Sequence, residues 1–343
     1  KEVMMKIIAT IGPSSMKSQV LKQLITSGLE SIRLNFSHFH DEEFHKIVSE
    51  VRNINNKVEI IGDLRGRKVR VSEKVFSTYK IHMEDIVYFC GEDMYDYLLK
   101  DERLLKSLIP LNINSSNINK NKINKISMKD DTMNFEVLDQ SKGIIKSRVL
   151  NEGIIRGGKG CNIPELTIDG PGLSILDKES IIWGLNHDLD SFCQSYVESE
   201  KDIIELKEFV EKNNKRNKEI LYYGKIETEK GINSIEKICD SVDEVIIARG
   251  DLMPECGIED AVKNQYIAIN KLKEKGYEDK IIMATHLLDS MIKGNRAKYT
   301  EVESIFSFMV NGINGFLLAG ETSIGKYPVE AFLFLKSLIE YYA

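Results

Sequence analysis

Two short charged strings in the second half of the chain have the residue types and spacing for chemistry. Lys225 and Glu227 directly follow one apolar run, and Arg249 and Asp251 directly follow the next. A short β-branched or aromatic run that ends abruptly in charge is typical of a buried parallel strand. Two carboxylates beside a Lys and an Arg can hold a divalent cation and an anionic substrate together. The sequence therefore predicts a metal-assisted site for an anion at one edge of a sheet.

The elements that must position these residues alternate between strands and helices. Such alternation predicts parallel strands joined by right-handed crossovers. Eight strand–helix units favour a (β/α)8 TIM barrel of the α/β class, with a doubly wound open sheet as the structural alternative. The predicted strands are 6–10, 31–35, 58–63, 191–196, 220–225, 244–248, 280–284 and 315–318, and the predicted helices are 18–27, 42–53, 178–186, 200–213, 233–239, 261–275, 301–311 and 328–341.

The third strand breaks this rhythm, because no helical pattern follows Asp63 for a long stretch. Alternating apolar and polar residues at 133–137 and 144–149 predict strands, and the Asn-, Lys- and Ser-rich segment 113–125 predicts a loop. We expect a small all-β domain inserted in the third connection, where it could act as a lid. The predicted domains are a barrel of residues 1–70 and 163–343 and a β-rich lid of residues 71–162.

The carboxyl ends of the strands form the catalytic face of such a barrel. Glu227 and Asp251 are the leading ligands for a divalent metal such as Mg²⁺, the alternative being helix caps or surface charges. Oxygen atoms of Asn35, Ser37 and Asp63 could bind a second, monovalent cation. The strand ends carry Thr10, Asn35, Ser37, Asp63, Ser195, Lys225, Glu227, Arg249, Asp251, Thr285 and Glu321.

Other residues near these ends have both a chemical and a structural interpretation. Lys225 and Arg249 could neutralise charge on a transferring group, or form salt bridges with neighbouring carboxylates. Thr285 could relay a proton, or cap a following helix at 287–292. The basic loop 157–160 could contact nucleotide phosphates or be a simple turn, and it lacks the spacing of a P-loop.

Composition narrows the class of protein. The net charge of −6 argues against a general nucleic-acid binder. No apolar run approaches the roughly 18–20 residues needed to cross a bilayer. The five cysteines are scattered and form no CxxC pair, so we expect free thiols in a reducing cytoplasm. The expected partners are small molecules, with neither nucleic acid nor membrane among them.

At these residues the chain resembles the pyruvate kinase family. Each motif is short, but together they occur in the family's order along nearly the whole chain. The matching segments are Lys6–Ser15, Arg33–His38, Gly160–Pro164, Lys225–Glu227, Ala248–Leu252, Ala284–His286, Gly320–Thr322 and Tyr327–Ala331.

The resemblance implies phosphoryl transfer between phosphoenolpyruvate and ADP, giving pyruvate and ATP, with Mg²⁺ or Mn²⁺ and commonly K⁺. It assigns Lys225, Thr285 and Arg33 to catalysis and Glu227 with Asp251 to the divalent metal. Asn35, Ser37 and Asp63 would surround the monovalent cation. Substrate would contact Arg249, Gly250, Asp251, Thr285 and Arg70, with backbone amides of 249–251 holding its carboxylate. Nucleotide would contact Asn35, His38, Arg70 and Lys159.

Departures from the family pattern leave the substrate open. The family's Asp-Thr-Lys-Gly-Pro-Glu-Ile-Arg is replaced by Asp63–Arg70, which loses Thr, Pro and Glu and gains positive charge. His286 replaces a Gln, and Met253 lies in an altered segment. A paralogue acting on another phosphoryl donor, acceptor or 2-oxoacid enolate is therefore the alternative, followed by a catalytically dead metabolite-binding regulator. Because the sequence ends at Ala343, the family's C-terminal regulatory domain and its tetramer are not expected, and a homodimer is left open.

Overall fold

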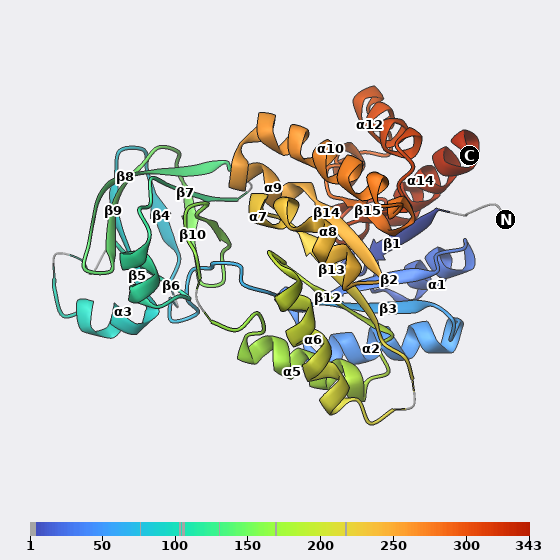
Figure 1. The fold of residues 1–343 in the computed structure, drawn as a ribbon, viewed down its shortest axis with the longest axis horizontal. Helices are drawn as coiled ribbons and strands as arrows, with labels where there is room; N and C mark the ends of the chain where they lie inside the picture. The colour runs from blue at the N-terminus through green and yellow to red at the C-terminus, as the bar shows by residue number, and fades with distance from the viewer. Residues whose placement is uncertain are drawn as a thin grey trace. The chain divides into compact units, whose positions relative to one another are not determined.

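The computed structural model describes residues 5–75, 77–102, 104, 107–129, 131–168, 170–216 and 218–343. The chain divides into two compact units. The first comprises Lys1–Gly66, Gly172–Gly250 and Val262–Ala343, and the second comprises Arg67–Pro171 and Asp251–Ala261. Figure 1 shows the elements of both units, coloured along the chain.

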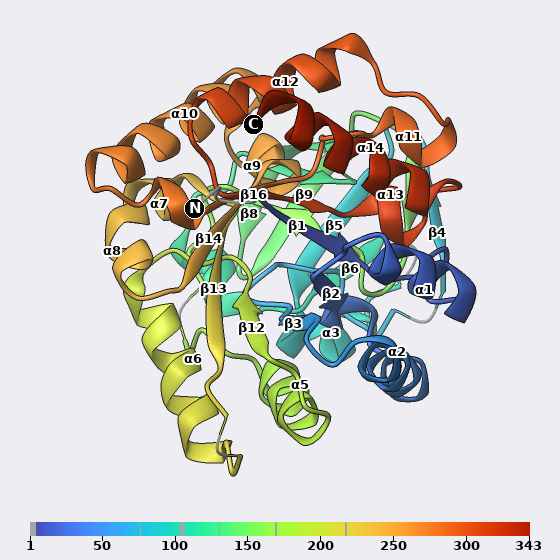
Figure 2. The same cartoon turned by 90° about the vertical axis from the view of Figure 1, so that its right-hand side faces the viewer.

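The first unit is a closed barrel of eight parallel strands, ringed by helices in Figure 2. The strand order around the barrel is β1-β16-β15-β14-β13-β12-β3-β2, and every neighbouring pair is parallel. The (β/α)8 prediction is confirmed, and the open-sheet alternative is wrong because the sheet closes on itself. The strands are β1 Lys6–Thr10, β2 Ser31–Asn35, β3 Glu59–Asp63, β12 Ser191–Gln194, β13 Leu221–Ile226, β14 Glu244–Ala248, β15 Ile281–Ala284 and β16 Gly315–Leu318.

The helices of this unit bury apolar stripes against the barrel. In α6, for example, Ile203, Leu206 and Val210 are buried at helical spacing. The helix predicted at 233–239 is instead two short helices, α7 and α8, that meet at Ser234. The helices are α1 Ser18–Thr26, α2 Asp41–Ile54, α5 Ile175–Asn186, α6 Glu200–Asn213, α7 Glu229–Asn233, α8 Ile235–Asp240, α11 Ser290–Lys293, α12 Tyr299–Val310, α13 Gly320–Ser323 and α14 Pro328–Tyr342, with 3-10 turns at Phe36–His38 and Glu278–Lys280. Two further helices, α9 Arg249–Cys256 and α10 Ile258–Glu274, have residues assigned to both units.

Side chains fill the interior of the barrel, so it is a packed core rather than a pore. Tyr223 is its largest member, and small alanines lie near the carboxyl ends of β14 and β15. This interior cluster comprises Ile8, Ile61, Cys193, Tyr223, Ile246, Ala248, Ile282, Ala284 and Leu317.

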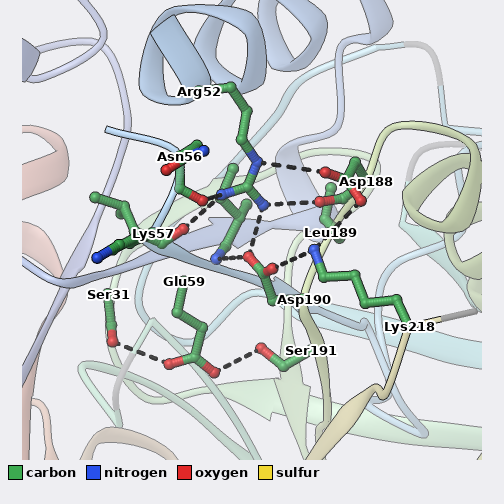
Figure 3. A network of polar contacts seen from close by, with 12 residues as sticks. Ser31, Arg52, Asn56, Lys57, Glu59, Asp188, Leu189, Asp190, Ser191 and Lys218 are labelled. Atoms are coloured by element: carbon green, nitrogen blue, oxygen red, sulfur yellow. Dashed lines mark hydrogen bonds and ion pairs between the residues drawn. The ribbon is translucent and has the colours of Figure 1, made fainter. Parts of the chain in front are cut away.

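The amino end of the barrel carries a network of ion pairs and hydrogen bonds, drawn in Figure 3. Arg52 of α2 donates to Asp190 Oδ2 at 2.7 Å and to the Val58 carbonyl at 2.6 Å. The same Asp190 oxygen accepts from the Ile60 amide at 2.7 Å, and Lys218 pairs with Asp190 Oδ1 at 2.7 Å. One aspartate therefore joins helix α2 to the beginnings of β3, β12 and β13.

A second polar cluster lies at the same end, centred on the carboxylate of Glu59. This carboxylate accepts from Ser31, from Ser191 (Figure 3) and from the Tyr223 hydroxyl, and it pairs with Lys6 Nζ at 2.9 Å. Lys6 also contacts Glu244 Oε1 at 3.1 Å. These four partners, Ser31, Ser191, Tyr223 and Lys6, give Glu59 the saturated contacts of a structural group.

The second unit contains a six-stranded mixed sheet in the order β11-β7-β8-β9-β5-β6 and a two-stranded sheet of β10 and β4. The strands predicted at 133–137 and 144–149 correspond to β8 and β9. Two short helices were not predicted, and one of them falls in the expected loop 113–125. The elements are β4 Tyr79–Ile81, β5 Ile86–Gly91, α3 Glu92–Leu98, β6 Leu108–Leu111, α4 Ser115–Lys120, β7 Lys125–Met128, β8 Met133–Ser141, β9 Ile144–Val149, β10 Gly153–Ile155 and β11 Cys161–Asn162.

The core of the second unit is separate from that of the barrel. Phe89 and Phe135 meet edge to face inside it with ring centroids 5.2 Å apart. The boundaries predicted for a lid domain, 71–162, remain a prediction. Across the described ranges, no helix combines the length and apolar character that a bilayer crossing requires.

Candidate active site

Buried strands deliver the predicted chemical residues to the carboxyl end of the barrel. Asp63 and Asn35 are the last residues of the paired strands β3 and β2, where they lie directly opposite each other. Lys225 lies in β13 opposite Ile246 of β14, and Glu227 follows β13 directly. Because neighbouring strands are parallel, their ends gather these side chains at one rim.

A buried cluster surrounds Asp63 and is made by the side chains of Arg33, Lys225 and Ser195. Arg33 Nε and Nη2 both contact Asp63 Oδ2 at 2.5 Å, and Lys225 Nζ contacts the same oxygen at 3.0 Å. Ser195 Oγ donates to Asp63 Oδ1 at 3.0 Å. The side chain of Asp63 is 1% exposed and those of Arg33 and Lys225 are 12% exposed. One carboxylate is therefore shared by two cations with little access to water.

The pKa values of this cluster follow from that arrangement. Burial alone would raise the pKa of Asp63, but Arg33 and Lys225 hold it below its ordinary value. Burial alone would lower the pKa of Lys225, but Asp63 and Glu227 raise it above its ordinary value. Both groups are therefore charged at neutral pH, and Lys225 is a fixed cation rather than a proton donor.

Glu227 is held beside this cluster by the backbone. Its Oε2 accepts from the Tyr196 amide at 2.8 Å, and its Oε1 lies 3.7 Å from Lys225 Nζ. Tyr196 has a left-handed backbone (φ 54°), a conformation uncommon outside glycine, which turns its amide toward the carboxylate. The interpretation of Glu227 as a surface charge is thus wrong, since the residue is 2% exposed.

Asp251, the other predicted metal ligand, belongs to the second unit and lies in the first turn of α9, directly after Gly250. Lys68 Nζ donates to Asp251 Oδ1 in that unit. Lys68 stands in the altered segment where the family usually has Glu. Carboxylates are the donors that Mg²⁺ prefers. In the described part of the chain, however, no three His, Cys, Asp or Glu side chains gather as a ready-made metal site.

The residues predicted to bind a monovalent cation already have partners in the chain. Asn35 Oδ1 accepts from the Ser37 amide at 3.1 Å, which caps the 3-10 turn Phe36–His38. Asp63 is neutralised by Arg33 and Lys225. The cation site remains a prediction, and its strongest expected ligand is engaged by two cationic side chains.

Thr285 lies in a turn after β15 rather than at the cap of a helix, since the next helix, α11, begins at Ser290. Its Oγ1 accepts from the Gly250 amide at 2.7 Å. The Arg249 guanidinium contacts the carbonyls of Thr285 and His286. The strands β14 and β15 thus bring Thr285 to the segment 249–250, and the substrate contacts expected of these residues remain a prediction.

Glu321 supports the same turn from the end of β16. It is 1% exposed and accepts from the amides of Leu288 at 3.1 Å and Ala319 at 2.9 Å. Burial raises the pKa of Glu321, against the pull of these backbone donors. Glu321 therefore ties the Leu288 amide of this turn to the end of β16.

The remaining predicted contacts are divided between the two units. Asn35 and His38 belong to the barrel unit, and Arg70 and Lys159 belong to the second unit. In the second unit Arg70 Nη1 donates to the Gly158 carbonyl at 3.1 Å, which places it on the basic loop 157–160. Burial, together with the nearby cations Lys129 and Arg156, lowers the pKa of Lys159.

Sequence reasoning missed several contacts that shape the site. A requirement for glycine at Gly66 was not anticipated: its φ is 63°, and an added Cβ would lie 2.2 Å from the Ser195 carbonyl oxygen. The contact of Lys68 with Asp251 and the contacts of Arg249 with two carbonyls were also missed. The retained glycine in an otherwise altered segment was the one available signal.

These observations define the class of protein. It is a (β/α)8 barrel with a mixed sheet inserted after the third strand and a buried Lys–Asp–Arg cluster at the strand ends, the face where barrel enzymes hold their active sites. Residues 3–332 match the family described as pyruvate kinase, barrel domain. The chain therefore belongs to the pyruvate kinase family.

Individual relatives agree with this assignment. The chain is 32% identical to a pyruvate kinase of Thermoplasma acidophilum over 336 residues, which is 98% of this chain and 58% of the relative. It is 30% identical to a pyruvate kinase of Geobacillus stearothermophilus, covering 95% of this chain and 54% of the relative. A pyruvate kinase of Thermococcus litoralis is 31% identical over 95% of this chain and 67% of its own length. The chain thus spans little more than half the length of most of these curated relatives.

Proposed function

We propose that the chain catalyses phosphoryl transfer between phosphoenolpyruvate and ADP, giving pyruvate and ATP. The observation that carries the proposal is the buried Lys225, held between Asp63 and Glu227 at the carboxyl end of the barrel. Membership of the pyruvate kinase family supports the same reaction.

Lys225 is suited to stabilise the charge that moves during phosphoryl transfer. Its neighbours keep it protonated, and its position is fixed before substrate arrives, so no reorganisation is needed during the reaction. Arg33, held by Asp63 and by Thr10 Oγ1 at 3.0 Å, supplies a second fixed cation for phosphate. Together the two cations would stabilise the negative charge of the transition state of phosphoryl transfer.

Glu227 and Asp251 are the residues proposed to hold Mg²⁺ or Mn²⁺. Both are carboxylates, and they follow the neighbouring strands β13 and β14 along the chain. The bound ion would supply charge neutralisation on phosphate oxygens. Arg70 and Lys159 are proposed to contact the nucleotide with Asn35 and His38, and K⁺ is proposed as a second ion near Asn35, Ser37 and Asp63.

Thr285 is proposed to lie where the enolate carbon of the product gains its proton. Its hydroxyl accepts from the Gly250 amide and donates to the Ala284 carbonyl at 2.6 Å. A hydroxyl that both accepts and donates can pass a proton along without becoming charged. The amides of residues 249–251 are proposed to hold the substrate carboxylate beside it.

A direct assay tests the proposal. The purified chain is mixed with phosphoenolpyruvate, ADP and Mg²⁺, with and without K⁺, and pyruvate is measured. Turnover of about 1–100 per second is expected, as for kinases in general. Glu227→Ala is expected to abolish both turnover and Mn²⁺ binding. Unchanged activity and metal affinity in that variant would contradict the site, and absence of pyruvate would contradict the reaction.

The contact of Lys68 with Asp251 favours a second candidate, a related enzyme with another phosphoryl donor, acceptor or enolate substrate. A cation paired with a proposed metal ligand changes the charge that substrate and metal meet. Metal-dependent exchange of deuterium into pyruvate, without ADP-dependent turnover, would support this candidate. Lys68→Gln is expected to tighten Mn²⁺ binding several-fold because it removes a competing cation.

A further inference from the structure

Two consecutive residues after β15 have a left-handed backbone although neither is glycine. Thr285 has φ 64° and His286 has φ 52°. For a β-branched residue such as Thr this conformation is an outlier. Such strain persists only where surrounding groups hold it, and it concentrates at functional sites. The question is which group holds this turn.

Arg249, at the beginning of α9, contacts both strained residues through their carbonyl oxygens. Its Nε donates to the Thr285 carbonyl at 3.0 Å, and its Nη2 donates to the same carbonyl and to that of His286, the latter at 2.7 Å. The planar fork of a guanidinium can reach two adjacent carbonyls at once, which the single ammonium of a lysine cannot match.

The Arg249 side chain is itself held by residues of helix α12. Its guanidinium lies 5.0 Å from the centre of the Phe308 ring, and Nη1 donates to Ser304 Oγ at 3.4 Å. Burial lowers the pKa of Arg249 to about 10, which leaves it charged at neutral pH. Helix α12 therefore braces an arginine whose donors point at the turn after β15.

The same turn fixes the Thr285 hydroxyl. With the backbone left-handed, Oγ1 accepts from the Gly250 amide at 2.7 Å, one residue after Arg249. Arg249 holds the carbonyl side of the turn and Gly250 holds its hydroxyl side. The position of the hydroxyl thus depends on the backbone conformation that Arg249 maintains.

We propose that Arg249 is a positioning residue that keeps Thr285 and His286 left-handed and so aims the Thr285 hydroxyl for proton transfer. The catalytic part of this inference rests on the proposed function. The conformational part does not, because it concerns only contacts within the barrel unit. It assigns the Arg249 side chain to the carbonyl side of the turn and the Gly250 amide to the Thr285 hydroxyl.

Arg249→Lys is the first test, because it keeps the charge and loses the fork. We expect kcat to fall roughly 10- to 100-fold, as for a small misplacement of a reacting group. The KM for phosphoenolpyruvate is expected to change little. Hydrogen exchange, followed by mass spectrometry, is expected to speed up at the amides of 284–291 and to stay unchanged in β1 and β2.

A glycine rescue distinguishes positioning from general support of the fold. His286→Gly, added to Arg249→Lys, removes the conformational cost at one strained residue and should restore kcat by roughly fivefold. Lys142→Gly is the matched control, since Lys142 also has a left-handed backbone (φ 49°) but lies in the β8–β9 turn. Equal rescue by both glycines, or rescue by neither, would overturn the proposal.

The outcomes separate the two proposals. If the wild-type chain fails to convert phosphoenolpyruvate, the proposed function fails, and hydrogen exchange at 284–291 still decides the role of Arg249. Unchanged exchange there in Arg249→Lys would overturn the inference whatever the activity. If Arg249→Lys does not fold, Ser304→Ala removes only the support at Nη1, and a smaller increase in exchange at 284–291 is required.

Discussion

The two ends of the barrel carry clusters of carboxylates and cations in different proportions. At the carboxyl end, one fully buried carboxylate, Asp63, lies between the cations Arg33 and Lys225. At the amino end, one cation, Lys6, lies between the carboxylates Glu59 and Glu244. Glu227 lies 3.7 Å from the same Lys225, so the first cluster balances two cations against two carboxylates, whereas the second has surplus negative charge.

The negative charge at the amino end is compensated by hydrogen bonds and ion pairs within the chain. Three hydroxyls and Lys6 satisfy Glu59. Burial raises the pKa of Glu244, and Lys6 does not reverse this because it is shared with Glu59. The comparison teaches that a buried charge cluster alone does not indicate a site. The end of the barrel at which a cluster lies carries the information, because barrel enzymes hold their active sites at the carboxyl ends of the strands.

The largest expected effect is on activity at the carboxyl end. Lys225→Met should lower kcat by about 100- to 1,000-fold, because it removes a preorganised cation at the transferring group. Steady-state kinetics with phosphoenolpyruvate and ADP measure this, and circular dichroism checks the fold. Activity within a factor of about three of wild type would show that the charge at this end is structural.

Asp63→Asn should produce the largest loss of stability, about 3–5 kcal/mol at pH 7, because two buried cations lose their shared carboxylate. The native pKa of Asp63 is lowered, so its contribution is complete above the ordinary value near ~3.9 and disappears as pH falls through the native value. Urea unfolding should therefore show wild type and variant converging as the pH falls below about 4. A constant difference at all pH values would contradict this.

Lys6→Met tests the other end with the matched substitution. Removing the one cation between Glu59 and Glu244 should cost about 1–3 kcal/mol of unfolding free energy, since two carboxylates then face each other. Activity of the folded protein should stay within a factor of about three. A selective loss of kcat here, with stability unchanged, would reverse the assignment of the two ends.

The smallest effect is expected for Glu244→Gln. The native pKa of Glu244 is raised by burial, so the stability it contributes is present below the ordinary value near ~4.3 and lost as pH rises through the native value. The variant cannot ionise, and its unfolding free energy relative to wild type should therefore increase from pH 4 to pH 7. Glu340→Gln, at an exposed position, is the control substitution, against which the change at Glu244 is measured.

Sequence patterns located the barrel because strands and helices repeat locally. The predicted strand 244–248 matches β14 residue for residue, and Asp63 ends β3 as expected. Helix α9 was missed because it starts directly at the end of β14, contains Pro254 and leaves no loop to signal it. In the second unit, α3 and α4 are too short for a helical period to stand out.

The candidate site was predictable as a set of residues and not as a set of contacts. The sequence predicts that Asp63, Lys225 and Glu227 lie together, because the carboxyl ends of parallel strands meet at one rim of the barrel. They do not say that Lys225 is shared between Asp63 and Glu227, or that Arg249 reaches the carbonyl of Thr285. Such pairings depend on side-chain direction across strands that are distant in sequence, which no local pattern encodes.

The pairing of β3 with β12 has a consequence for how the protein folds while it is being synthesised. Ile61 lies opposite Ser191, so an entire inserted segment must be synthesised before this seam of the barrel can form. At ~5–20 residues per second, the ribosome needs roughly 6–25 s to supply it. During that interval β3 presents an unpaired, apolar edge to the cell. Nascent chains paused in this window should therefore recruit chaperones more strongly than chains paused after residue 194.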